Sequence, residues 1–263
     1  MIRASSGRTV HLARAVASLL VAAATAAAPD AQAQSNTTPD TVELALVFGG
    51  DVTQQMHEAG FAYFFSETSK RSKGRIELHL VTGASWGSVT AALTALSSCL
   101  PANDDPTRDL GWLTWYDVGY KELFDKKGLT DISVLTRAQL VQHMSRAKQA
   151  WRNGLANNCD VVLGLVAARE HALPVETDRA HTVPRTEERF AVRLLGRGPG
   201  IFPRAENYVD AAAPLPQPLL PFVTDSDTPD AVSRNFDVLR DLVFAAAATP
   251  GLFSPQTLRL CHT

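Results

Sequence analysis

The stretch VTGASWGSVTAAL, residues 81–93, is the most informative part of the sequence. It places a serine between two glycines in the spacing G-x-S-x-G. An apolar run precedes Ser85 and an alanine-rich run follows it, a pattern that predicts a strand, a sharp turn and a buried helix. Such a turn holds a serine hydroxyl clear of the backbone, and the crowding there demands small neighbours such as Gly83 and Gly87. Ser85 is therefore predicted to be a nucleophile, in an elbow formed with Gly83, Trp86 and Gly87.

A second glycine turn lies earlier in the chain, after the apolar run VELALVF over residues 42–48. The run predicts a buried strand, and Gly49, Gly50 and Asp51 predict a tight loop after it. Backbone N–H groups of such a loop can hold the oxyanion that forms when a serine attacks a carbonyl. We expect this loop to provide that oxyanion hole for Ser85.

The chain between the two turns changes its hydrophobic period from that of a strand to that of a helix and back. A helix is predicted from residue 53, and spacings of three and four residues place one set of side chains on its core face: Met56, Ala59, Gly60, Tyr63 and Phe64. The stretch IELHLVTG, residues 76–83, predicts a strand again. This order of strand, helix, strand and helix predicts a parallel sheet covered by helices on both faces.

The remainder of the chain predicts two more helices and two more strands. The strands are VVLGLVA (161–167) and RFAVRLL (189–195), and residues 203–229, rich in Pro and Asp, predict a long surface excursion. The helices cover residues 136–151 and 230–248. Their predicted core faces are Leu140, Met144, Ala147 and Trp151 in the first, and Val232, Phe236, Leu239 and Val243 in the second.

Three segments together resemble the patatin-like phospholipase family: LALVFGGDVTQQMHEAG (44–60), HLVTGASWGSVTAAL (79–93) and AAAATPGLFSP (245–255). In that family a strand leads into a glycine-rich oxyanion loop, a second strand carries the serine, and a Pro-Gly-x-Phe-x-Pro segment follows later. The resemblance implies a three-layer α/β/α fold with a mainly parallel central sheet. It also implies a serine acyl hydrolase of the phospholipase or lysophospholipase type, which acts on lipid or phospholipid esters.

The chain departs from the family pattern at three points. In the oxyanion loop the family usually has a third glycine and then a basic residue, whereas Asp51 follows Gly50 here; and bulky Trp86 follows the serine. The family's base is an Asp in an Asp-Gly turn beyond the Pro-Gly-x-Phe segment, and this sequence contains no Asp-Gly dipeptide. The resemblance thus implies a chain cut short before its catalytic Asp. Asp210 precedes that segment and is interpreted as a surface residue.

Two other interpretations stay open. A Ser-His-Asp esterase of the α/β-hydrolase type would take its base from a histidine after the serine. The chain has four such residues: His143, His171, His181 and His262. A noncatalytic, lipid-binding protein on the same fold is favoured by the missing Asp, because a serine without a positioned base is a poor nucleophile.

The N-terminus has the pattern of an export signal. Arg3, Arg8 and Arg14 precede an apolar run over residues 15–28, which is followed by Ala31-Gln32-Ala33. This order predicts a signal peptide over residues 1–33, a flexible leader over 34–42 and a patatin-like domain over 43–263. The protein is then expected to be periplasmic, outer-membrane-associated or secreted.

The three cysteines, Cys99, Cys159 and Cys261, are too few for a disulfide scaffold. Cys99 falls in an alanine- and leucine-rich helix pattern and Cys159 begins an apolar strand, so both are interpreted as buried small hydrophobic residues. Pairing of two cysteines stays open for an exported protein.

Composition and motifs exclude several classes of partner. The 263 residues include 25 basic and 27 acidic side chains, a formal net charge of −2, so no basic field predicts nucleic-acid binding. Metal-ligand and phosphate-loop motifs are absent from the sequence, and no cofactor or metal is expected. The expected partner is the lipid ester substrate. Peripheral contact of KRSKGR (70–75) with a membrane is the alternative to a solvated loop.

Overall fold

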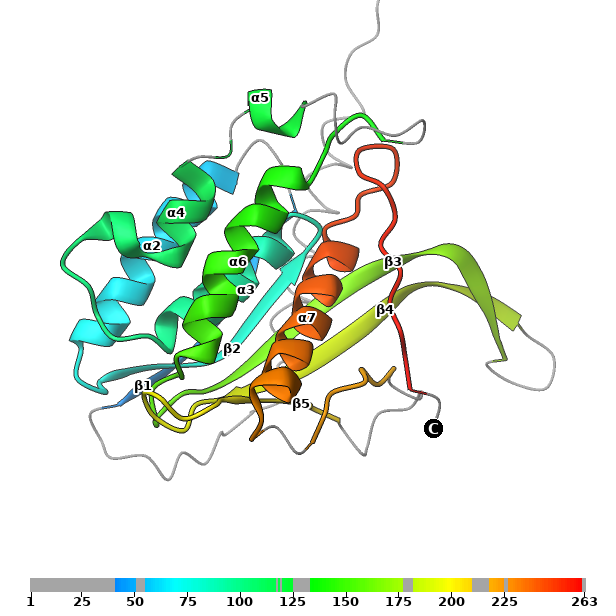
Figure 1. Ribbon diagram of the computed structural model, residues 1–263. Helices are drawn as coiled ribbons and strands as arrows, with labels where there is room; N and C mark the ends of the chain where they lie inside the picture. The colour runs from blue at the N-terminus through cyan, green and yellow to red at the C-terminus, as the bar shows by residue number, and fades with distance from the viewer. Residues whose placement is uncertain are drawn as a thin grey trace, which may run out of the picture. The chain divides into compact units, whose positions relative to one another are not determined.

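A computed structural model describes most of the chain between Thr41 and Cys261 (Figure 1). The described residues are 41–50, 55–116, 118, 120–124, 133–176, 182–209, 218–224 and 227–261. They belong to one compact unit, Asp40–Thr263. The predicted signal peptide and residues 34–40 of the predicted leader lie outside the described residues.

The described residues contribute five strands to one sheet: β1 (Val42–Phe48), β2 (Ile76–Ala84), β3 (Asp160–Glu176), β4 (Thr182–Leu195) and β5 (Arg204–Asn207). Their order across the sheet is that of the sequence. The pairs β1–β2 and β2–β3 are parallel, whereas β3–β4 and β4–β5 are antiparallel. The sheet is therefore mixed, and the expectation of a mainly parallel sheet is correct only for its first three strands.

The antiparallel half follows from short connections. Only residues 177–181 separate β3 from β4, and a parallel pair needs a crossover of roughly a dozen residues or more. The two strands extend together beyond the rest of the sheet (Figure 1). β5 was not predicted, because its four residues begin the segment interpreted as a surface excursion.

Six helices lie in the described part of the chain: α2 (Gln55–Arg71), α3 (Gly87–Ser98), α4 (Leu110–Tyr116), α5 (Tyr120–Leu123), α6 (Ala138–Arg152) and α7 (Pro229–Ala246), with a 3-10 turn at Pro106–Arg108. In Figure 1, α2, α3, α4, α6 and α7 lie on the same side of the sheet. Two crossovers of the same hand that advance in the same direction place their helices on one face. The α/β class is confirmed, but the three-layer arrangement is not confirmed by the described residues.

The core lies between this helical layer and one face of the sheet. On β3, Val161, Leu163 and Leu165 are buried, whereas the alternating Val162 and Val166 are partly exposed. Eleven of the 12 residues of α3 are buried, so this helix is the centre of the layer. The predicted core faces of α6 and α7 are confirmed, since all eight residues named for them are buried.

The predicted core face of α2 is correct only in part. Ala59 is buried and Tyr63 is half-buried, but Gly60 is exposed, and Met56 and Phe64 are 57% and 68% exposed. The buried residues of α2 are Gln55, Ala59, Ala62, Phe65, Ser66 and Glu67. Apolar and aromatic residues occur all around this helix, so its composition does not single out one face. Packing against α3 selects the face with the small residues Ala59 and Ala62, which allow a close approach.

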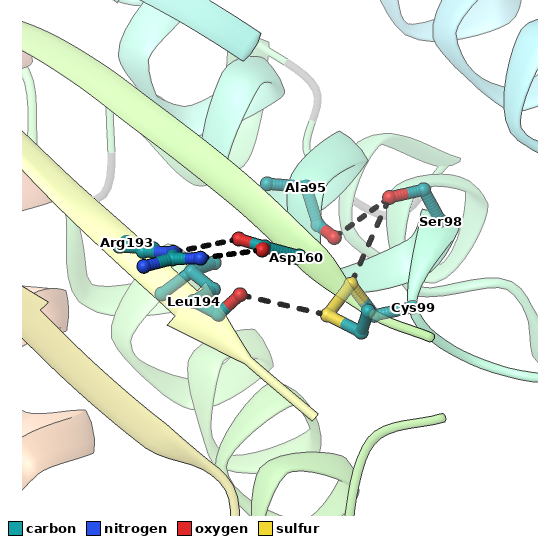
Figure 2. The surroundings of a disulfide bond; sticks show 7 residues. Ala95, Ser98, Cys99, Asp160, Arg193 and Leu194 are labelled. Atoms are coloured by element: carbon teal, nitrogen blue, oxygen red, sulfur yellow. Dashed lines mark hydrogen bonds and ion pairs between the residues drawn. A yellow bond between two sulfur atoms is a disulfide. The ribbon is translucent and has the colours of Figure 1, made fainter. Parts of the chain in front are cut away.

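Cys99 and Cys159 form a disulfide, with their Cα atoms 5.1 Å apart (Figure 2). Both are buried, as predicted, but their interpretation as unpaired hydrophobic residues was wrong. The bond joins the end of α3 to the start of β3. Next to it, Arg193 donates two hydrogen bonds to Asp160, at 2.8 and 2.6 Å. Cys261 is a free, exposed thiol.

The basic stretch over residues 70–75 is partly engaged in ion pairs. Lys70 Nζ lies 2.8 Å from Glu67 Oε1, and Arg71 Nη2 lies 3.2 Å from Glu67 Oε2. Burial acts to raise the pKa of the Glu67 carboxyl, but the hydrogen bond and charge of Lys70 and the hydrogen bond of Arg71 together hold it below its ordinary value of 4.5. These two cations are committed to acidic partners within the protein.

Candidate active site

Ser85 lies at the turn between β2 and α3, the position predicted for it. Its φ angle is 51°, in the left-handed region that residues other than glycine rarely adopt. Holding a serine there costs on the order of 1 kcal/mol or more, which the surrounding structure must offset. Strand, left-handed serine and helix in immediate succession are the geometry of a nucleophile elbow.

The two glycines that flank the elbow are required by close backbone contacts. A Cβ atom at Gly83 would lie 2.5 Å from the carbonyl oxygen of Gly87, and a Cβ atom at Gly87 would lie 1.9 Å from the carbonyl oxygen of Gly49. Backbone cannot move away from such contacts without a change in the turn. The glycine loop after β1 is thus packed directly against the first residue of α3.

Gly50 lies beside the serine. A Cβ atom at Gly50 would be 2.7 Å from Ser85 Cβ and 3.4 Å from Ser85 Oγ. The predicted proximity of the glycine loop to the serine is therefore present in the structure. Asp51, the third residue assigned to this loop, lies outside the described residues.

The amide of Gly49 is already committed. Its N–H donates to Glu58 Oε1 at 3.1 Å, and this hydrogen bond would have to break before Gly49 could donate to an oxyanion. Gln55 Nε2 donates to the other oxygen of Glu58 at 3.2 Å, and Gln55 Oε1 accepts from Thr90 at 3.0 Å. This chain of polar contacts joins the glycine loop to α2 and α3, and sequence reasoning missed it.

Trp86 occupies the N-cap position of α3, and no side chain caps the first turn. Two amides of this turn have backbone acceptors, since Ser88 N–H donates to Ser85 O and Val89 N–H to Trp86 O, each at 3.0 Å. The helix dipole favours an anion near this end of α3. Trp86 is 1% exposed, and its ring centroid lies 4.8 Å from that of Phe253 and 5.8 Å from that of Trp115. The bulky residue after the serine therefore anchors the elbow in the core.

Thr249 is the hydrogen-bond partner of the serine. Ser85 Oγ and Thr249 Oγ1 are 2.7 Å apart, and either can be the donor. Thr249 follows α7, in the segment AAAATPGLFSP, so the third resembling segment does meet the second one. A threonine hydroxyl orients Ser85 but is not a base that would accept its proton. Thr249 belongs to the segment AAAATPGLFSP, but nothing in that sequence predicted its contact with Ser85.

Compared with protein-family models, curated protein sequences and solved structures, the chain gives no match. An assignment of function therefore depends on the sequence motifs and on the geometry of the site.

The histidines offered as alternative bases do not meet the serine in the described part of the chain. His143 is buried on α6, and His171 is exposed on β3. His181 and His262, like Asp210, lie outside the described residues. Among the described residues, Ser85 Oγ forms its side-chain hydrogen bond with Thr249 Oγ1.

Within the described ranges, no group of His, Cys, Asp and Glu side chains is placed to hold a metal ion. No helix in those ranges is long and apolar enough to cross a membrane.

A cavity of about 640 Å³ lies beside Thr249. Ala248 and Pro250, its two neighbours in the sequence, both line this cavity, as does Phe253, which packs against Trp86. Ser85 itself does not line it. The two sequence neighbours of the hydrogen-bond partner of Ser85 thus line a cavity of the size of a small-molecule site.

Proposed function

We propose that this protein is a patatin-like serine acyl hydrolase that acts on lipid esters, of the phospholipase or lysophospholipase type. The observation that carries the proposal is the left-handed conformation of Ser85 at a strand-to-helix turn. Strain at a polar residue of this kind is typical of functional sites. The resemblance of three separate segments to one family supports the same reaction.

In this reaction Ser85 Oγ would attack the ester carbonyl carbon while its proton passes to a base. The amides of Gly50 and Trp86 would donate to the oxyanion, since Gly50 adjoins the serine and Trp86 is the residue after it. The alcohol leaves with a proton when the ester C–O bond breaks. Water then cleaves the acyl–serine ester and releases the fatty acid.

A noncatalytic, lipid-binding protein on the same fold is the second candidate. It is favoured by the hydroxyl of Thr249, which occupies the hydrogen-bond position of Ser85 Oγ where a hydrolase has a base. In that case the elbow is retained and the lipid is bound without turnover.

Labelling with a fluorophosphonate separates the two candidates, because this reagent reacts with activated serines. The full chain is expected to be labelled and the Ser85→Ala variant unlabelled. Ser88→Ala is the matched control, since Ser88 is buried on the same helix and its loss should leave labelling unchanged. Absence of labelling in the parent protein would favour the binding protein.

We also propose that the protein is exported. The signal-peptide pattern supports this location, and so does the disulfide between Cys99 and Cys159, because such bonds persist in oxidising compartments. N-terminal sequencing of the protein recovered outside the cytoplasm should begin at Gln34. Recovery of an intact N-terminus from the cytoplasm would contradict the proposal.

A further inference from the structure

The cavity beside Thr249 lies where ligands bind in folds of this class. β2 ends at Ala84, which pairs with Val166, and β3 continues beyond this point through Ala167. Sites in open α/β sheets lie outside the carboxyl ends of the parallel strands. Ala167, the residue of β3 that follows the partner of the last residue of β2, lines the cavity.

Two charged side chains of the cavity, from β3 and β4, are paired with one another. Glu188, whose side chain is 7% exposed, accepts from Arg169 Nε at 2.6 Å and lies 2.5 Å from Arg185 Nη2. Glu170, His171, Gln256 and Thr257 form the rest of the polar lining. Because Glu188 and its arginines already satisfy one another, this group does not by itself require a charged ligand.

The remaining walls are mainly apolar. Ala245 and Ala248 contribute from α7 and the turn after it, and Phe253, Leu258 and Leu260 contribute from the segment that follows. Phe253 also contacts Trp86, so this apolar wall is continuous with the packing behind the elbow. An apolar chain placed here would remove carbon surface from water on both partners.

We infer that this cavity binds the acyl chain of the ester that is cleaved at Ser85, and that the small side chain of Ala248 leaves room for long chains. The inference rests on the proposed function and extends it to substrate selection. Ala248 adjoins the partner of Ser85 and has the smallest apolar side chain, so a larger residue there would fill the cavity next to the reacting carbonyl. Each methylene buried is worth about 0.8 kcal/mol, or about fourfold in kcat/KM, until the cavity is full.

The test compares 4-nitrophenyl butanoate, octanoate, dodecanoate and hexadecanoate as substrates. For the parent protein kcat/KM should rise with chain length and then level off. Ala248→Trp should abolish the preference for longer chains and keep hydrolysis of the butanoate. Val141→Trp, at a 49% exposed position on α6, is the matched control and should leave the profile unchanged. Leu258→Ala should instead move the plateau to longer chains.

A binding measurement keeps this inference distinct from the proposed function. Ser85→Ala protein should bind the fluorescent fatty acid cis-parinaric acid, and adding Ala248→Trp should weaken that binding by about tenfold or more. This result would uphold the cavity assignment even if no ester is hydrolysed. Urea unfolding curves should first show that the parent and Ala248→Trp are both folded. If the two then hydrolyse the esters with the same chain-length profile, the cavity assignment is overturned and the hydrolase proposal is left intact. Fatty-acid binding unaffected by Ala248→Trp would also overturn it.

Discussion

Removal of the Cys99–Cys159 disulfide should lower the free energy of unfolding by an amount that its loop length determines. The two cysteines are 60 residues apart in the sequence. In the chain-entropy model, closing a loop of that length lowers the conformational entropy of the unfolded state. The resulting stabilisation of the folded state is on the order of 4 kcal/mol at 25 °C. The variant for this test is Cys99→Ala with Cys159→Ala, since two alanines leave no unpaired thiol in the core.

Urea unfolding followed by far-ultraviolet circular dichroism measures the effect. With an m-value of roughly 2–3 kcal/mol/M, the midpoint should fall by about 1.5–2 M. All proteins should also contain Cys261→Ser, because Cys261 is exposed and could form the wrong disulfide. A midpoint that does not change, or two free thiols titrated after unreduced Cys261→Ser protein is unfolded, would refute the pairing and the argument built on it.

Three further predictions concern the elbow, a buried ion pair and the base. Gly87→Ala should destabilise the protein by several kcal/mol in urea unfolding, because its Cβ atom would lie 1.9 Å from a backbone oxygen; Gly60→Ala, with no atom within 4 Å, should be neutral or stabilising. The folded-state pKa of Glu67 lies below its ordinary value of 4.5, so the ionised carboxylate adds stability that is full above about pH 4.5 and is lost as the pH falls through the folded pKa. Glu67→Gln should therefore cost stability at pH 7, and the cost should shrink as the pH falls below 4.5. Thr249→Asp should raise fluorophosphonate labelling of Ser85 at least tenfold, approaching the ~10²-fold effect of a positioned base, whereas equal rates in the isosteric Thr249→Asn would contradict that role.

The elbow could be predicted because its requirements leave a local mark in the sequence. The turn leaves no room for a side chain at Gly83, and the backbone of the loop after β1 leaves none at Gly87. Both restrictions are visible as glycines two residues from the serine. The core faces of α6 and α7 could be predicted equally well, because polar residues on the outer face of each helix leave one apolar face. In α2, apolar residues occur on every side of the helix. The same reasoning therefore chose Met56 and Phe64, which are exposed.

Other features depend on contacts between distant segments, which local patterns do not report. The Ser85–Thr249 hydrogen bond joins residues 164 positions apart, and a threonine after an alanine run has no distinctive signal. The capture of the Gly49 amide by Glu58 depends on how α2 returns over the loop. The disulfide could be recognised only once the end of α3 and the start of β3 were placed together.

Helix α3 is fixed at both ends and buried between them. Its first residue is pressed against the backbone of the loop after β1, and its last turn is tied covalently to β3 through Cys99. The serine thus has a rigid mount that ligand binding does not have to organise. In the proposed hydrolase, substrate range would change through replacements in the walls contributed by residues 245–260 and by the β3–β4 pair, while Ser85 keeps its position.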